Sequence, residues 1–301
     1  MSHKKPSLLL GAHMSIAGGL EYAYQAGESI GCTAIQIFTK SNRQWAAKEL
    51  QPDDVNAFKL AQKKSHIKST IAHATYLINI GASDPATHQK SVNALRIELD
   101  RCEQLNIDYL VLHPGSHGNT DEKTCLNKIS DTLNTLFNAT KTRTVILLEN
   151  MAGQGSAVCY RFEHLGYIIA QSDFKQRLGV CFDTCHAFAA GYDFRTRDTY
   201  EAMWQLFDEA IGIHKLKAIH LNDSKKALGS RVDRHEDIGK GSLGLEPFAL
   251  LLNDPRFFDI PKILETPQSD LHESILQDYA RNMDTLKGLM TPKTKDLLDC
   301  I

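Results

Sequence analysis

The stretch "LGVCFDT" at residues 178–184 is an almost uninterrupted apolar run that ends on a carboxylate, Asp183. A strand with one face in water alternates apolar and polar residues, whereas a run that is apolar throughout is typical of a parallel strand covered on both faces. The stretch therefore predicts a buried parallel strand. Its carboxyl end carries Asp183, and His186 follows within one turn of chain.

Seven further runs of this kind occur along the chain, each short, rich in leucine and β-branched residues, and bounded by turn residues. The eight runs are "SLLLGAH" (7–13), "TAIQIFT" (33–39), "STIAHA" (69–74), "YLVLHPG" (109–115), "TVILLEN" (144–150), "LGVCFDT" (178–184), "LKAIHLND" (216–223) and "IPKILET" (260–266). Segments with helical spacing separate them. Eight strand-helix units in a chain of 301 residues predict an α/β fold of the (β/α)8 or TIM-barrel type, with a doubly wound open sheet as the alternative.

The segments between the strands predict the apolar and charged faces of one helix and the first residues of two helices. Between the third and fourth strands, one helix face is expected to be apolar, with Val92, Leu95, Leu99 and Cys102. Its charged residues are expected to point outward, namely Arg96, Glu98 and Arg101. Capping patterns from Asp198 to Glu201 and from Asp270 to Glu273 predict two helix starts.

Composition limits the class of protein. No linker divides the chain, so we expect a single barrel domain over residues 1–301, and a monomer because a closed barrel needs no partner. The longest apolar run is far too short for a membrane span, which predicts a cytoplasmic protein without membrane contacts. Seven cysteines without a Cys-x-x-Cys pair exclude a disulfide framework and a zinc ribbon. A net charge of −2 excludes coating of nucleic acid by bulk charge but leaves room for a local basic rim.

Six successive runs finish on a residue that can bind a metal: His73, His113, Glu149, Asp183, His220 and Glu265. In a parallel barrel all six side chains meet at one mouth, where TIM-barrel enzymes keep their chemistry. Burial of so many titratable groups without a counter-charge costs several kcal/mol for each group. The pattern therefore predicts a metal centre.

Three more candidates lie outside the strands. His186 follows Asp183, and the long connection from Asp223 to Gly244 carries Asp233 and His235, which an extended backbone would aim to one side. Five imidazoles and four carboxylates are too many for one ion and suit two or three ions of zinc, manganese or iron. Such a cluster is suited to phosphoryl transfer. Ligation by Cys185 is the alternative, but we interpret the cysteines as packing residues because no second thiol lies at ligand spacing.

Several stretches together resemble the endonuclease IV family of zinc-dependent apurinic/apyrimidinic endonucleases. They are "GAHMSIAGGL", "FTKSNRQW", "HATYLINIG", "LHPGSHG", "LENMAGQG", "CFDTCHAFAAGYD", "HLNDSK", "GSRVDRHEDIGKGSLG" and "ILET", in register from about Gly11 to Thr266. The resemblance implies a TIM barrel with three Zn²⁺ ions, with Mn²⁺ as an alternative at some sites. It implies a hydrolase of base excision repair that acts on double-stranded DNA. A metal-activated hydroxide would cleave the phosphodiester 5′ to an abasic site, leaving a 3′ hydroxyl and a 5′ deoxyribose phosphate.

The resemblance also assigns the ligands to ions. His73, His113 and Glu149 would hold the first zinc; Glu149 would bridge to a second, held also by Asp183, His220 and Glu265; and His186, Asp233 and His235 would hold the third. Glu149 and Glu265 are the expected catalytic residues, and Glu149 would also orient the nucleophile.

The DNA contacts are expected on loops at the same mouth. By resemblance Arg43 and Tyr76, with Leu77 beside them, would enter the duplex and fill the gap left by the flipped abasic sugar. A local basic rim is expected from Lys225, Lys226, Arg231, Arg234 and Lys240, beside the acidic Glu236 and Asp237.

Two other functions compete with this interpretation. A metal-dependent sugar isomerase shares the barrel and a carboxylate-rich mouth, but it would leave Asp233 and His235 without a role. A zinc-stabilised DNA-binding module needs a closed site of four ligands rather than nine.

Neither His13 nor His117 is given a ligand role by the resemblance, and we expect both to be hydrogen-bonded structural residues.

Overall fold

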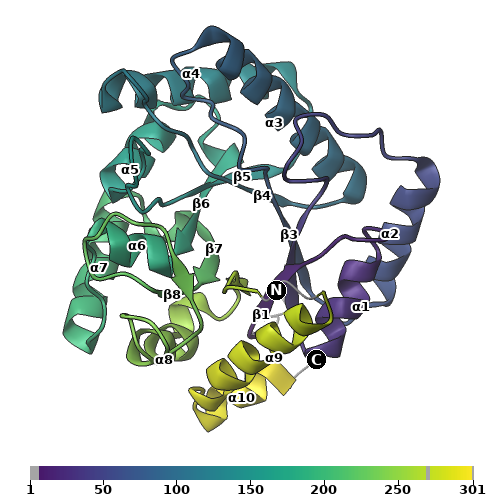
Figure 1. Cartoon of the computed structure of the whole chain (residues 1–301), viewed down its shortest axis with the longest axis vertical. Helices are drawn as coiled ribbons and strands as arrows, with labels where there is room; N and C mark the ends of the chain where they lie inside the picture. The colour runs from purple at the N-terminus through teal and green to yellow at the C-terminus, as the bar shows by residue number, and fades with distance from the viewer. Residues whose placement is uncertain (1–6, 269–271, 300–301) are drawn as a thin grey trace, which may run out of the picture.

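Eight parallel strands form a closed barrel in the computed structural model, which describes residues 7–268 and 272–299 (Figure 1). The strands are β1 (Leu10–Met14), β2 (Ala34–Phe38), β3 (Ser69–His73), β4 (Tyr109–Leu112), β5 (Val145–Glu149), β6 (Leu178–Asp183), β7 (Leu216–Leu221) and β10 (Lys262–Leu264). Each strand pairs with the next, and β10 pairs with β1 to close the ring. The predicted TIM barrel is confirmed, and the open-sheet alternative is wrong.

Helices surround the barrel (Figure 1). They are α1 (Tyr22–Ser29), α2 (Pro52–Lys64), α3 (Pro85–Leu105), α4 (Glu122–Ala139), α5 (Phe162–Gln171), α6 (Thr184–Ala190), α7 (Arg197–Ala210), α8 (Glu246–Asn253), α9 (His272–Gly288) and α10 (Pro292–Asp299). Short 3-10 turns cover Lys175–Arg177, Ile213–Lys215 and Pro255–Phe257. Among the described residues, no helix is both long and apolar enough to span a membrane.

The connection between β7 and α8 folds into a small antiparallel hairpin rather than a plain loop. Its strands are β8 (Asp223–Ser224) and β9 (His235–Glu236). The buried carboxylate of Asp223 accepts hydrogen bonds from the backbone N–H groups of Gly239 and Gly241 at 3.0 Å each and of Leu243 at 2.9 Å. This carboxylate holds the returning chain against the barrel, which gives the hairpin a fixed position over the mouth.

The inside of the barrel is filled by a layer of apolar side chains, which we call the interior apolar layer. Its members are Ala34, Ile71, Val111, Leu147, Cys181, Ala218 and Ile263, all fully buried. They come from seven of the eight strands and pack against one another. Because side chains alternate between the two faces of a strand, residues two positions further along each strand also point inward, toward the carboxyl end.

The expectation that Glu98 and Arg101 point outward from α3 is wrong. Both are buried, whereas Arg96 is exposed as predicted. The loop after β2 folds over this face of the helix: Thr39 Oγ1 donates to Glu98 Oε2 at 2.6 Å, and Arg101 Nε donates to the Thr39 carbonyl at 3.0 Å. Periodicity located the helix, but it carried no information about the loop that covers the charged face.

The N-terminal cap of α7 and the first residue of β1 differ from the predictions. Helix α7 is capped by Thr196, whose side chain and that of Thr199 form the reciprocal capping box, so the predicted start at Asp198 with Glu201 is wrong. The start of the pattern from Asp270 to Glu273 lies outside the described residues. Strand β1 begins at Leu10, three residues after the predicted start at Ser7.

Gly11 is required at the seam between β1 and β2, because a Cβ atom there would lie 1.6 Å from the carbonyl oxygen of Ala34. We expect Gly11→Ala to lower the free energy of unfolding by about 3 kcal/mol, as severe overpacking does. The matched control is Gly288→Ala in α9, where nothing lies within 4 Å of an added Cβ. Urea unfolding followed by circular dichroism should show a change below about 1 kcal/mol for the control. Equal effects of the two variants would contradict the seam constraint.

Candidate metal centre

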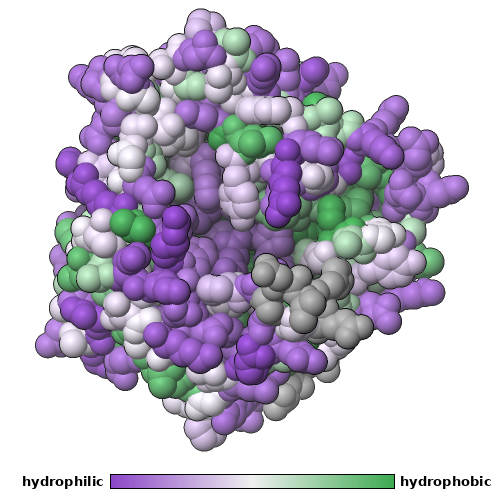
Figure 2. Space-filling view, in the orientation of Figure 1, coloured by the Kyte–Doolittle hydropathy of each residue, from purple (hydrophilic) through white to green (hydrophobic). Residues whose placement is uncertain are grey.

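Eight polar side chains form a ring directly above the interior apolar layer. Each lies two residues beyond an inward-facing position of its strand, as Glu149 does beyond Leu147 and Asp183 beyond Cys181. The ring, which we call the mouth ring, consists of His13, Gln36, His73, His113, Glu149, Asp183, His220 and Glu265. A hydrophilic hollow opens at the centre of the molecular face in Figure 2. The six strand-end candidates therefore share one layer.

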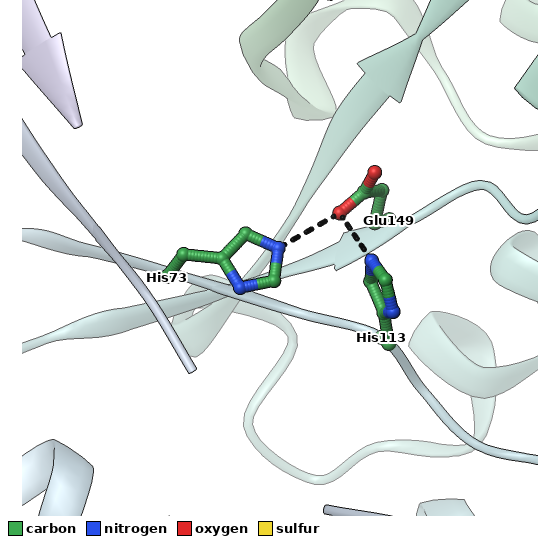
Figure 3. A group of neighbouring side chains, drawn as sticks. All are labelled: His73, His113 and Glu149. Atoms are coloured by element: carbon green, nitrogen blue, oxygen red, sulfur yellow. Dashed lines mark hydrogen bonds and ion pairs between the residues drawn. The ribbon is translucent and has the colours of Figure 1, made fainter. Parts of the chain in front are cut away.

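The first cluster joins His73, His113 and Glu149, whose side chains point toward one another (Figure 3). The Nε2 atoms of His73 and His113 lie 3.3 and 3.2 Å from Glu149 Oε2. His73 Nδ1 lies 2.6 Å from the carbonyl oxygen of Ala74 and must donate to it, so its Nε2 carries the lone pair in the neutral ring. Both Glu149 and His73 are buried.

The second cluster lies on the other oxygen of the same carboxylate. His220 Nδ1 is 3.2 Å from Glu149 Oε1 and 3.1 Å from Glu265 Oε2. It is also 3.8 Å from Asp183 Oδ2. One potential ligand atom from each of these four residues lies within 4.8 Å of the others. Glu149 thus presents one oxygen to each of two clusters.

The third cluster is completed by the hairpin. His186 Nε2 lies 3.1 Å from Asp233 Oδ2, and His235 Nε2 lies 3.4 Å from Asp233 Oδ1. The Nδ1 atoms of the two rings donate to backbone carbonyls, His186 to Asn150 at 2.9 Å and His235 to Glu265 at 3.0 Å. Within the described part of the chain, the buried Nε2 atoms of His186 and His235 have no hydrogen-bond partner. Asp183 also lies close enough to share this cluster.

This donor set fits divalent cations. Two buried imidazole nitrogens without hydrogen bonds, beside several buried carboxylates, form an arrangement that an ion would complete. Burial alone would raise the pKa of Glu149, but the imidazoles of His220 and His113 hold it well below its usual value. Burial disfavours protonation of His186, yet Asp183 and Asp233 raise its pKa well above the usual value. Positive charge is therefore favoured here, as protons or as metal ions.

Sulfur ligation remains geometrically open but is chemically disfavoured. Cys185, Asp233 and His235 lie near enough to hold an ion together. The Cys185 thiol instead donates to the carbonyl of Arg234 at 3.5 Å, and burial raises its pKa to about 12. A thiol binds zinc as the thiolate, so this shift favours the interpretation of Cys185 as a packing residue.

The residues expected to contact DNA lie at the edge of the same hollow. Tyr76 is 52% exposed, and its ring centroid lies 5.3 Å from that of His113. Arg43 is exposed and lines a cavity of about 670 Å³ together with Tyr76 and Glu265, while Leu77 is half-buried. The Arg43 loop is tied to the Tyr76 loop because Thr75 Oγ1 donates to the Asn42 carbonyl at 2.5 Å. Arg43 and Tyr76 therefore stand over the mouth ring.

Sequence reasoning missed the uncharged residues that orient the ligands. Asn222 donates to Asp183 Oδ2 at 2.7 Å and accepts from the backbone N–H of Glu265 at 2.9 Å. Asn150 accepts from the backbone N–H of Asp183 at 2.8 Å. The sequence signal that could have identified Asn150 and Asn222 is a polar residue that directly follows an apolar run.

The two histidines left without a ligand role are hydrogen-bonded. His117 donates from Nδ1 to the Thr120 carbonyl at 2.6 Å. His13 Nδ1 is 2.9 Å from Gln36 Nε2 and 3.2 Å from Glu265 Oε1. It therefore belongs to the mouth ring and contacts one of the candidate ligands.

Comparison with known proteins identifies the family. A protein-family model described as "Xylose isomerase-like TIM barrel" matches residues 24–289. The chain is 49% identical over 266 residues to "Probable endonuclease 4" of Citrifermentans bemidjiense, covering 88% of this chain and 94% of that protein. It is 48% identical over 283 residues to the protein of the same name from a Geobacter species, covering 94% and 99%. The chain belongs to the endonuclease IV family.

Solved structures agree with this membership. The endonuclease IV of Thermus thermophilus matches with a TM-score of 0.80 and 36% identity, covering 93% of this chain and 98% of that chain. A D-tagatose 3-epimerase-like protein matches with a TM-score of 0.68 but only 17% identity, covering 96% and 98%. The second likeness shows a shared barrel alone.

The metal content of two variants tests which side chains hold ions. We expect His186→Ala to lower the bound zinc by about one ion per chain, because its unpartnered Nε2 faces Asp233. The matched control is Cys185→Ser, one residue away and equally buried, which should keep the full content. Metal analysis of purified protein gives the counts. Loss of an ion from the serine variant as complete as that from the alanine variant would show sulfur ligation.

Proposed function

We propose that this protein is a metal-dependent endonuclease that cleaves double-stranded DNA 5′ to an abasic site, leaving a 3′ hydroxyl and a 5′ deoxyribose phosphate. One observation carries the proposal: nine side chains with groups that could ligate a metal, five imidazoles and four carboxylates, converge at a single mouth in a chain of the endonuclease IV family. All nine come from one chain, so a monomer suffices for the site. The cofactor proposed is three Zn²⁺ ions, with Mn²⁺ as an alternative at some sites.

Divalent ions bound at such a mouth would supply a Lewis acid for the phosphoryl oxygens and would activate water at neutral pH. The side chains supply the geometry. Glu149 has one oxygen toward His73 and His113 and the other toward His220, which suits a bridging carboxylate that also orients a nucleophile. Glu265 closes the second cluster opposite Glu149 and is the second catalytic carboxylate of the proposal.

DNA recognition is assigned to the edge of the mouth. Arg43, which is exposed at the mouth, would meet a phosphate, and the half-exposed ring of Tyr76, with the neighbouring Leu77, would act as an apolar wedge in the base stack. The basic rim is partly neutralised, since Lys240 lies 2.7 Å from Asp237 and Lys225 lies 3.9 Å from Glu236. Binding should therefore rely on a few well-placed contacts rather than on bulk positive charge.

Incision of a synthetic duplex tests the function. The substrate carries one tetrahydrofuran abasic analogue, which cannot undergo β-elimination, so only hydrolysis can cut beside it. We expect incision 5′ to the analogue, loss of incision after stripping with a strong chelator, and recovery when zinc is added. Glu149→Gln, which keeps the side-chain shape, should lose most turnover and controls for contaminating nuclease. Absence of incision by protein that demonstrably holds metal would overturn the proposal in favour of a sugar isomerase.

The role of Arg43 is tested by salt dependence. We expect Arg43→Ala to raise KM for the abasic duplex and to reduce the slope of log K against log salt by about one, as loss of one phosphate contact does. The matched control is Arg143→Ala. Arg143 is also exposed but precedes β5 at the opposite end of the barrel, where it pairs with Glu103. Equal slopes for Arg43→Ala and the wild type would remove Arg43 from the interface.

A further inference from the structure

Gln36 is the one member of the mouth ring whose side chain does not titrate. It lies on β2 two residues beyond Ala34 of the interior apolar layer, and its side chain is fully buried. The rest of β2 is apolar, so a glutamine here requires an explanation. A buried carboxamide costs free energy unless its donors and acceptor are all hydrogen-bonded.

The contacts of the carboxamide fix its orientation. Nε2 lies 2.5 Å from Glu265 Oε1 and 2.9 Å from His13 Nδ1, and Oε1 lies 2.8 Å from His220 Nε2. A carboxylate can only accept hydrogen bonds, so the amide nitrogen must face Glu265. The amide oxygen then faces His220, and the reversed orientation would set two acceptors against each other.

This orientation determines which nitrogen of His220 is free. Because the oxygen of Gln36 accepts from Nε2–H, the lone pair of the neutral imidazole lies on Nδ1. That atom is 3.1 Å from Glu265 Oε2 and 3.2 Å from Glu149 Oε1, at the centre of the second cluster. Gln36 therefore contacts two neighbouring ligands and presents both of them to the same point.

The other candidate ligands show why this contact matters. His73, His186 and His235 each donate their second ring nitrogen to a backbone carbonyl, which a side-chain substitution does not remove. His220 uses a side chain for the same purpose. The hydrogen bond of its Nε2 atom therefore comes from one side chain that is itself no candidate ligand.

We propose that Gln36 is a positioning residue that fixes the tautomer of His220 and the orientation of Glu265, and so sets the metal affinity of the second cluster. The proposal rests on the metal-dependent function proposed above. Partners behind the ligands of a metal site typically contribute 10- to 100-fold in affinity. Gln36 accomplishes this without touching the ion or the DNA.

The test measures metal affinity directly, without DNA. Gln36→Met keeps an unbranched side chain of similar length but removes the polar contacts with Glu265, His13 and His220. Titration of metal-free protein with zinc against a chromogenic chelator should show one class of site weakened by about 10- to 100-fold, with the other sites unchanged. Incision at low free zinc should fall likewise and recover at saturating zinc with KM for DNA unchanged. An unaltered zinc affinity would overturn the proposal.

A matched control separates positioning from packing. Thr33 is a buried polar residue that precedes the same strand, where its hydroxyl bonds the backbone at Leu8 and Leu10. Thr33→Val should lower the thermal midpoint of the metal-free protein but leave every zinc affinity unchanged. Equal losses of affinity in the Thr33 and Gln36 variants would show that Gln36 acts only through stability, which contradicts the proposal.

A second variant and the wild-type titration distinguish failure of this proposal from failure of the proposed function. If Gln36→Met does not accumulate as folded protein, Gln36→Ala removes the same carboxamide without added bulk and carries the same expectation. The wild-type titration tests the function itself, because a wild-type protein that binds no zinc contradicts the proposed metal dependence. Wild-type binding of zinc with equal binding by the Gln36 variants contradicts only the role of Gln36.

Discussion

The burial of charged side chains at the carboxyl ends of the barrel strands is the constraint on which the rest of the site depends. The interior apolar layer fills the barrel, and the two-residue period of a strand then places one side chain from each strand in the mouth ring above it. Carboxylates such as Glu149 and Asp183 are fully buried there. A buried carboxylate needs cations or hydrogen-bond donors to compensate its charge. The geometry that closes the core therefore favours the imidazoles around Glu149 and the amide of Asn222 beside Asp183.

Hydrogen bonds from neighbouring groups orient the imidazoles and carboxylates of the site. The second ring nitrogens of His73, His186 and His235 face backbone carbonyls, and that of His220 faces the carboxamide of Gln36. Asn222 links Asp183 to Glu265. At the edge of the mouth, Glu98 accepts from Thr39 on one loop and from the backbone N–H of Thr75 on the next. Helix α3 thereby fixes the two loops that carry Arg43 and Tyr76 relative to the metal centre.

The barrel and the convergence of the candidate ligands at its mouth could be predicted from the sequence, for a physical reason. Buried parallel strands are apolar throughout, so a charged or imidazole residue at the end of such a run is conspicuous, as at Glu149 and His220. Gln36 was missed because an uncharged residue inside a run does not suggest a ligand. The burial of Glu98 was missed because helical spacing cannot reveal a loop that folds back over a charged face. The hairpin that brings His235 to His186 is held by hydrogen bonds from the backbone to Asp223. No local sequence pattern predicts these hydrogen bonds.

Anomalous X-ray diffraction from crystals of the purified protein, recorded on both sides of the zinc absorption edge, tests the central claim most directly. The account predicts three peaks at the barrel mouth: one beside His73 and His113, one between Glu149 and Glu265, and one beside His186 and His235. A zinc-loaded protein with no peak at these side chains, or with its peaks elsewhere on the chain, would contradict it.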